Sequence, residues 1–269
     1  MIDLPVITSR QNPRIVAARQ LVTRKGREAQ GCFLVEGVKL LGSALQAAAR
    51  PRTAFVCHEL LTPLAAALVQ PLAAAGAEIV PVSAAVMAAL TEREAAEGLV
   101  ATFELFETPL ARFAPRHGRL VLLLDRLQDP GNLGTLLRTA DAVAAAGVLL
   151  LEPCVDPFDP KTVRGSMGSL FHLPIVRTAD LPAALAHLRG HGYTLLGADA
   201  HRGNDWGAGL WQGRVALALG NEARGLSADV AAATDAWVRL PIPGQAESLN
   251  VAVAGGVLLY TWLRALSAA

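Results

Sequence analysis

The segment that decides the fold reads Pro241-Ile-Pro-Gly-Gln-Ala-Glu-Ser248-Leu-Asn250-Val-Ala-Val-Ala254. It is a Pro/Gly loop that runs into an apolar helix. Pro and Gly set a turn, and Ser248 or Asn250 is suited to cap the first N–H groups of that helix. Exposed N–H groups at such a helix start favour anionic or polar ligand atoms. Taken alone, however, the segment is explained by helix capping.

Two junctions upstream have a similar build. The buried-strand pattern Leu120-Val-Leu-Leu-Leu-Asp125 leads into the loop Arg126-Leu-Gln-Asp-Pro-Gly-Asn-Leu-Gly134 and then into a helical segment. The strand pattern Val215-Ala-Leu-Ala-Leu219 ends in Gly220-Asn-Glu-Ala-Arg-Gly-Leu-Ser227. Ligands of open α/β sheets bind outside the carboxyl ends of the strands, so we expect the loops to converge on one site.

In this order, the loops resemble the three motifs of the SpoU (TrmH-like) branch of the SPOUT RNA methyltransferases. The motifs read Asn132-x-Gly134-x-x-x-Arg138, Gly220-Asn-Glu222-x-x-Gly225-Leu226 and Pro241-Ile-Pro-Gly-x-x-x-Ser248-Leu-Asn250-Val. The resemblance covers about residues 119–266. The segment from Ile7 through Gly37 resembles the L30e-like RNA-binding domain that often precedes the catalytic domain. Many members have Gly where this chain has Ala223, and a positive φ there would strain an alanine.

The resemblance implies an enzyme that uses S-adenosylmethionine to methylate the ribose 2′-hydroxyl of RNA. It favours ribosomal RNA over transfer RNA as substrate and implies a deep C-terminal trefoil knot. The implied catalytic and positioning residues are Asn132, Arg138, Glu222, Ser248 and Asn250. The implied cofactor-binding residues are Leu196, Gly197, Ala198, Leu219, Gly220, Ile242 and Leu249.

Arg138 has two interpretations. As a surface residue it would pair with Asp141, three positions along the same helix. As the catalytic candidate it is poorly suited to be a general base, because a guanidinium stays protonated in proteins. Holding a phosphate or stabilising a developing 2′-alkoxide fits its chemistry better.

Alternation of helical and strand patterns predicts an α/β protein with two domains. We place an RNA-binding domain at residues 1–110 and the methyltransferase domain at 111–269, joined through the Pro-containing stretch 107–118. The second domain has apolar strand patterns near 120–124, 148–151, 193–197, 215–219 and 236–240. Continuous apolar strands are typical of a mostly parallel sheet covered by helices on both faces.

The first 30 residues are basic in a chain whose formal net charge is only +1. Six basic residues stand there against Asp3 and Glu28, a net charge of +4. A solvated helix face explains this pattern, and so does an RNA-binding surface that contacts phosphates. The candidate RNA-binding residues are Arg10, Arg14, Arg19, Arg24, Lys25 and Arg27.

Composition excludes several classes of protein. Aromatic residues make up only 5% of the 269 residues, which disfavours a base-stacking platform. Three isolated cysteines and unclustered histidines predict neither a disulfide framework nor a metal site and favour a reducing cytoplasm. We expect no signal peptide, because the N-terminus MIDLPVITSR lacks its apolar core. We also expect no membrane span, since no uninterrupted apolar run reaches the roughly 20 residues required.

Two other functions remain open from the sequence. One is a non-catalytic RNA-binding or ribosome-assembly protein with the same fold. The other, an NAD(P) enzyme of the Rossmann type, is disfavoured because no G-x-G-x-x-G follows a strand. The segment Leu249–Leu263 is apolar on nearly every face, so we also expect a homodimer through the C-terminal domain.

Overall fold

The computed structural model describes residues 5–91, 97–113 and 119–267. The chain forms two compact units. The first contains Met1–Phe106 and Phe158–Phe171, and the second contains Glu107–Pro157 and His172–Ala269. The division predicted near residue 110 did not foresee that residues 158–171 belong with the first unit. Part of the expected linker, residues 114–118, lies outside the described residues.

Aromatic packing holds the returning segment in the first unit. The ring centroids of Phe33 and Phe158 are 4.8 Å apart, and those of Phe33 and Phe171 are 6.1 Å apart. Phe33 and Phe158 are fully buried. The sequence pattern could not reveal this return, because each contact joins aromatic residues more than a hundred positions apart.

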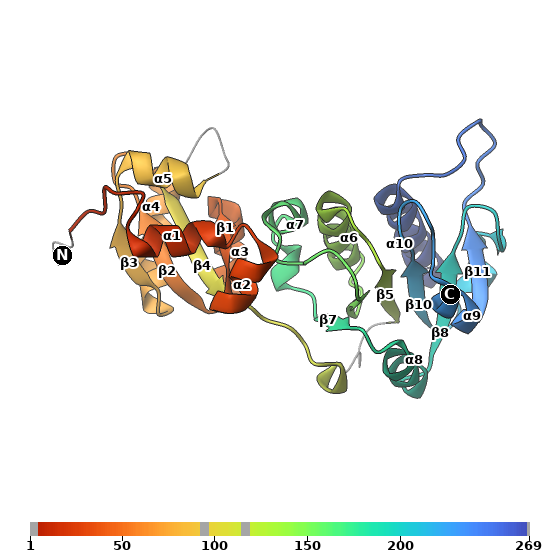
Figure 1. Ribbon diagram of the computed structural model, residues 1–269. Coiled ribbons are helices and arrows are strands. Elements are labelled where there is room, and N and C mark those ends of the chain that lie inside the picture. The colour runs from red at the N-terminus through yellow and green to blue at the C-terminus, as the bar shows by residue number, and fades with distance from the viewer. Residues whose placement is uncertain (1–4, 92–96, 114–118, 268–269) are drawn as a thin grey trace. The chain divides into compact units, whose positions relative to one another are not determined.

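A four-stranded mixed sheet forms the centre of the first unit (Figure 1). Strand β4 is antiparallel to both of its neighbours, while β2 and β3 are parallel. In the order of the sheet, the strands are β1 (Cys32–Glu36), β4 (Leu99–Glu104), β2 (Pro51–Val56) and β3 (Glu78–Pro81). The helices are α1 (Pro13–Gln20), α2 (Arg24–Gln30), α3 (Val38–Gln46), α4 (Pro63–Ala74), α5 (Ala84–Leu90), α7 (Pro160–Ser166) and the 3₁₀ turn η2 (Ser169–Phe171).

The basic segment within the first 30 residues forms two helices. Helix α1 ends at Gln20, and α2 begins at Arg24 after a short turn. Thr23 interrupts the helix because its hydroxyl accepts the N–H of Gly26 at 3.1 Å and caps α2 instead.

A seven-stranded sheet forms the second unit, and all of its neighbouring strands are parallel. This confirms the predicted α/β architecture and parallel sheet. In sheet order, the strands are β7 (Ile175–Thr178), β6 (Gly147–Leu151), β5 (Leu120–Asp125), β10 (Arg214–Leu219), β8 (Tyr193–Ala198), β11 (Ala236–Arg239) and β9 (Asn204–Asp205). The helices are α6 (Pro130–Ala142), α8 (Leu181–Gly190), α9 (Ala228–Ala233), α10 (Val251–Ser267) and the 3₁₀ turns η1 (Leu110–Arg112) and η3 (Ala208–Trp211).

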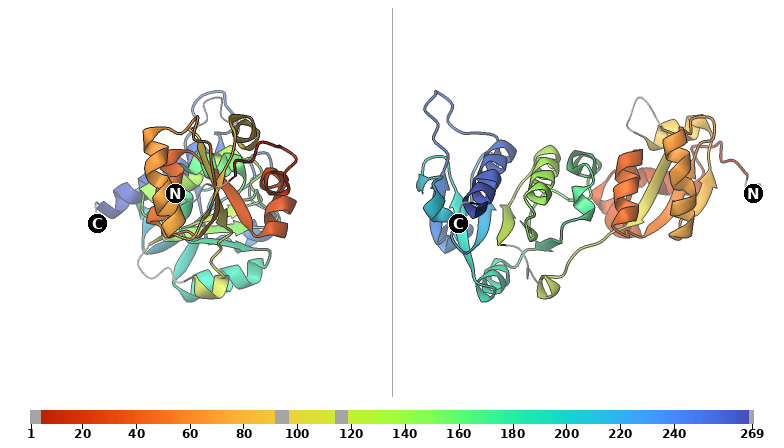
Figure 2. Two further views of the ribbon diagram at one scale, coloured as in Figure 1. Left: turned by 90° about the vertical axis from the view of Figure 1, so that its left-hand side faces the viewer. Right: turned by 180° about the vertical axis from the view of Figure 1, so that it is seen from behind.

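Both faces of this sheet are covered. Val121 and Leu123 of β5 pack in one core cluster with Ala184 and Leu188 of α8. Helices α6 and α10 lie side by side (Figures 1 and 2). They approach β10 so closely that a Cβ on Gly255 would lie 2.5 Å from Leu136 and 2.6 Å from Leu219. A side chain at position 255 would therefore force both leucines to move.

Strands β7 and β9 were not predicted. Both lie at the edges of the sheet, and β9 contains only two residues, both exposed. β9 contains no apolar residue, and β7 contains only Ile175 and Val176, which is too short an apolar run to identify a strand.

Candidate active site

Two of the predicted loops follow neighbouring strands. β5 and β10 pair in register, with Leu124 opposite Leu219, and each is followed by the loop that carries a motif. The third motif ends at the start of α10, which packs against α6. Because parallel strands end at the same edge, the first two motifs meet there, and α10 brings in the third.

Glu222 joins the second motif to the first. Its carboxylate accepts the backbone N–H groups of Gln128 at 3.3 Å and Asp129 at 3.2 Å. It also accepts the side-chain Nδ2–H of Asn132 at 3.0 Å. Asp129 in turn caps α6 by accepting the N–H of Asn132 at 2.7 Å. One carboxylate therefore sets the position of the loop that begins α6.

Asn132 also contacts the third motif. Its Oδ1 accepts Nδ2–H of Asn250 at 3.0 Å, and Oδ1 of Asn250 accepts the N–H groups of Ala252 at 2.9 Å and Val253 at 3.3 Å. Backbone N–H groups can only donate, and the Glu222 carboxylate accepts, so the amide orientations between them are fixed. Donation runs from α10 through Asn250 and Asn132 to Glu222.

The second motif is a closed loop. Asn221 and Gly225 exchange backbone hydrogen bonds of 2.9 Å, and Gly225 has a left-handed φ of 66°. Gly220 lies under this loop, where an added Cβ would be 2.1 Å from the carbonyl carbon of Gly225. Ala223 is not among the residues with positive φ, so the departure from Gly at this position causes no backbone strain.

Asn221 was not selected from the sequence, yet it shapes the same loop. Its Oδ1 accepts the N–H groups of Ala223 at 3.0 Å and Arg224 at 3.1 Å, and its Nδ2 donates to the carbonyl of Arg126 at 3.0 Å. Asp125, which ends β5, accepts the N–H of Ser227 at 2.6 Å. Their signal in the sequence is a polar side chain directly at a strand end.

A cavity of about 500 Å³ opens beside these loops. Five of the predicted cofactor residues line it: Ala198, Leu219, Gly220, Ile242 and Leu249. Glu222, Ser248 and Asn250 line it as well. Leu196 and Gly197 do not; Leu196 is buried in the sheet, and an added Cβ on Gly197 would meet Thr234 and Trp237. These two positions therefore pack within the sheet.

Arg138 is exposed on α6 and is not among the residues that line the cavity. The surface pairing considered for it is not present, since Asp141 contacts Nδ1 of His172 at 2.9 Å instead. Arg138 lies six residues beyond Asn132, on a helix whose buried face includes Leu133, Leu136 and Leu137.

The candidate RNA-binding residues of the first unit have different environments. Arg27 is buried and donates to the carbonyls of Leu21 at 2.8 Å and Val22 at 3.0 Å, so it serves packing and not the surface. Arg10 donates to the carbonyl of Ala85. Arg14 pairs with Glu78 and Arg24 with Glu28. Arg19 and Lys25 are exposed.

A family comparison decides what these loops belong to. Residues 119–260 match the model of the SpoU rRNA methylase family. The chain is a member of this family. Residues 12–101 match the MRM3-like substrate binding domain. Among the described residues, no cluster of His, Cys, Asp and Glu is arranged to hold a metal ion, and no helix is long and apolar enough to cross a membrane.

Two similar proteins match nearly the whole chain. An uncharacterized tRNA/rRNA methyltransferase of Synechocystis is 38% identical, with 96% of this chain and 93% of the relative covered. The 23S rRNA (guanosine(2553)-2′-O)-methyltransferase RlmP of Bacillus subtilis is 35% identical, with 94% and 97% covered.

Solved structures show the same fold. An rRNA methyltransferase from Sinorhizobium meliloti superimposes with a TM-score of 0.88 at 32% identity over 98% of both chains. The SpoU methyltransferase AviRb from Streptomyces viridochromogenes, in complex with AdoMet, has a TM-score of 0.86 at 30% identity, covering 96% of this chain and all of that one.

Proposed function

We propose that this SpoU family member transfers a methyl group from S-adenosylmethionine to a ribose 2′-oxygen of ribosomal RNA. The observation that carries the proposal is the hydrogen-bonded link of Glu222, Asn132 and Asn250, which joins three family motifs beside one cavity. The relatives whose names specify 23S rRNA 2′-O-methylation support the reaction and the substrate.

The cavity suits S-adenosylmethionine. Its volume of about 500 Å³ is in the range of small-ligand sites. Leu219, Ile242 and Leu249 give it apolar walls for an adenine ring. Asp199 and Glu247 line it too, and these carboxylates complement a cationic ligand. When bound there, the cofactor supplies an electrophilic methyl group on a sulfonium.

The residues of this chain would orient the acceptor. A displacement at carbon needs the 2′-oxygen in line with the bond that breaks, so positioning provides much of the acceleration. Ser248 and Asn250 present hydrogen-bonding groups at the cavity. Arg138, a permanent cation, would hold the adjacent phosphate or stabilise the developing 2′-alkoxide, since a protonated guanidinium cannot serve as a base.

The exposed side of α10 supports a homodimer. Val253 is 54% exposed and Tyr260 is 53% exposed. The two residues are seven positions apart and lie on one face of the helix. Arg138 is exposed on the neighbouring α6. Because α6 packs against α10, burial of this face would bring a second copy close to α6, and the active site of one subunit could draw on Arg138 of the other.

Two further features accompany the proposal. The family resemblance implies a trefoil knot in the segment that carries the second and third motifs.

An enzyme that modifies ribosomal RNA works where that RNA is made or assembled, so we place the protein in the cytoplasm.

A methylation assay tests the proposal. Purified protein, methyl-labelled S-adenosylmethionine, and ribosomal or transfer RNA from cells lacking the gene are combined, and 2′-O-methyls are mapped. We expect label at one ribose of ribosomal RNA. Label only in transfer RNA would change the substrate. Absence of both cofactor binding and label in either RNA would support the non-catalytic alternative.

A further inference from the structure

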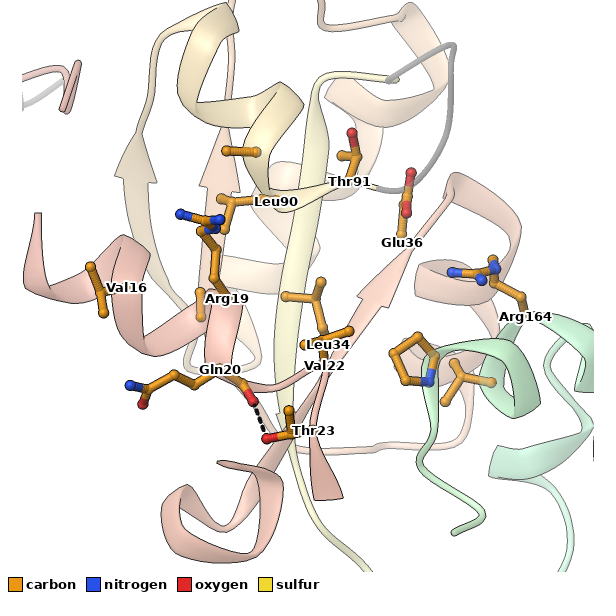
Figure 3. Close-up of a pocket in the computed structure, with 14 residues that line it drawn as sticks. Val16, Arg19, Gln20, Val22, Thr23, Leu34, Glu36, Leu90, Thr91 and Arg164 are labelled. Carbon is orange, nitrogen blue, oxygen red and sulfur yellow. Dashed lines mark hydrogen bonds between the residues drawn. The ribbon is translucent and has the colours of Figure 1, made fainter. Parts of the chain in front are cut away.

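A second cavity, of about 470 Å³, lies within the first unit (Figure 3). Helices α1 and α5, strand β1 and the returning helix α7 surround it. Its walls are mostly aliphatic and include Val16, Leu34, Leu90, Pro160 and Val163. It shares no residue with the cavity of the candidate active site.

Two arginines from distant parts of the chain line this cavity. Arg19 comes from α1 and is exposed, while Arg164 comes from α7 and is half-buried. Arg19 belongs to the basic segment whose net charge over the first 30 residues is +4. An apolar cavity with cationic walls complements a ligand that has an anionic group and a flat apolar body. Nucleotides have both, and guanidinium planes also stack on bases.

Glu36 makes the two ends of the cavity chemically different. It is the last residue of β1, only 9% exposed, and lies apart from Arg19 in Figure 3. A carboxylate repels phosphate and accepts hydrogen bonds from the N–H groups on the pairing edge of a base. The phosphate is thus favoured at Arg19, away from Glu36.

We propose that this cavity receives one unpaired nucleotide of the RNA substrate, with its base against the aliphatic wall and its phosphate at Arg19. The proposal rests on RNA being the substrate. Unpaired bases are the parts of RNA that proteins can enclose and read. Few aromatic residues are available to this protein, so an aliphatic and guanidinium pocket takes the place of a stacking platform.

Filling the cavity is the first test. Ala89 of α5 lines it, whereas the adjacent Ala88 is exposed and does not. The probe is a fluorescein-labelled, single-stranded RNA decamer of mixed sequence, followed by anisotropy. Ala89→Phe should weaken binding about tenfold or more, the loss that one enclosed base typically carries. Ala88→Phe should bind like the wild type. Equal binding by both variants would overturn the proposal.

An abasic scan keeps the test valid even if Ala89→Phe folds poorly. In the wild-type protein, removing the base at one position of the decamer should weaken binding as much as filling the cavity does. With Ala89→Phe, that same abasic site should cost nothing more, because the two changes remove one interaction. A decamer with no sensitive position, or one that the wild type does not bind, contradicts the proposal.

Arg19→Gln and Lys25→Gln remove one charge each from the same segment. If both residues contact phosphates, each change should make the negative slope of log affinity against log salt shallower by about 0.7. Only Arg19→Gln should also reduce the penalty at the sensitive abasic site. If neither change affects that penalty, Arg19 does not hold the enclosed nucleotide. If the wild type methylates RNA and Ala89→Phe binds the decamer with unaltered affinity, this site is refuted and the proposed function stays intact.

Discussion

Asn250 donates its side-chain N–H to Oδ1 of Asn132 across 3.0 Å, joining two motifs that are 118 positions apart in the chain. The same Asn250 caps α10 through its Oδ1. The side chain of Asn250 therefore caps a helix with its oxygen and joins two motifs with its N–H group. A substitution can remove one of these interactions and keep the other.

Asn250→Asp tests the link without removing the cap. Aspartate caps helices as well as asparagine, but its carboxylate has no N–H for Asn132 and would face its carbonyl oxygen. We expect methyl transfer to fall about a hundredfold, while the thermal unfolding midpoint changes little. Asn250→Ala should lose activity as well and also about 1 kcal/mol of stability, the usual value of an N-cap. Normal turnover of the aspartate variant would show that the link is dispensable.

Gly220→Ala tests how tightly the second motif must close. A Cβ at this position would lie 2.1 Å from the backbone of Gly225, so the loop has to move away. Because the loop lines the cavity, we expect affinity for S-adenosylmethionine, measured by calorimetry, to fall at least about tenfold. Gly244→Ala is the matched control, since an added Cβ there meets nothing within 4 Å. Equal affinities of the two variants would argue against binding at this loop.

Arg138→Ala tests whether Arg138 acts in methyl transfer without contributing to cofactor binding. Arg138 is exposed and does not line the cavity, so cofactor affinity should stay within a few fold of the wild type. Turnover should be abolished, because Arg138 is the residue proposed to hold the phosphate or stabilise the alkoxide. Arg138→Lys keeps the charge and should recover only part of the rate, as an ammonium lacks the planar fork. Near-normal turnover of the alanine variant would remove Arg138 from the mechanism.

The apolar periodicity of the sequence was sufficient for the central strands and for the loops after β5 and β10. Buried strands with continuous Val, Leu and Ala carry a strong signal, and polar residues at their ends mark a site. Contacts between distant segments were harder. The burial of Arg27 depends on the carbonyls of Leu21 and Val22 at the turn after α1, and a charge in a basic run carries no mark of such burial.

The departures at Leu196 and Gly197 have a similar origin. The resemblance implies Leu196 and Gly197 as cofactor-binding residues, but β8 is enclosed by β10 and β11, and Gly197 is covered by Thr234 and Trp237. Only Ala198, one residue further along, reaches the cavity. The point along a strand where the packing ends depends on its neighbours, and those are set by topology.

Cys154 predicts a stability change in alkaline solution. Burial, reinforced by the nearby charge of Glu152, raises its pKa from 9.0 to about 12, despite an opposing backbone hydrogen bond from Leu127. The folded protein therefore holds this proton more tightly than the unfolded chain. The resulting stabilisation is complete below pH 9 and is lost as the pH rises toward 12.

Comparison with Cys154→Ala isolates this effect. Between pH 8 and pH 10.5, the wild type should lose about 2 kcal/mol more unfolding free energy than the variant, as measured in urea. Other alkaline groups titrate in both proteins and cancel in the difference. Parallel pH profiles would mean that the thiol ionises in the folded state as easily as in the unfolded chain.

The exposed face of α10 predicts the oligomeric state. Val253 and Tyr260 are about half exposed on one face of the helix, and we expect a second copy of the chain to cover them. Light scattering at micromolar concentration should give twice the mass of one chain. Val253→Glu should shift the protein to a monomer and reduce methylation with it, because a charge cannot be buried without a partner. Leu64, an exposed apolar residue on α4 of the first unit, provides the control, and Leu64→Glu should leave mass and activity unchanged. A wild-type monomer with full activity would refute the dimer, and a fully active Val253→Glu monomer would show that each subunit holds a complete site.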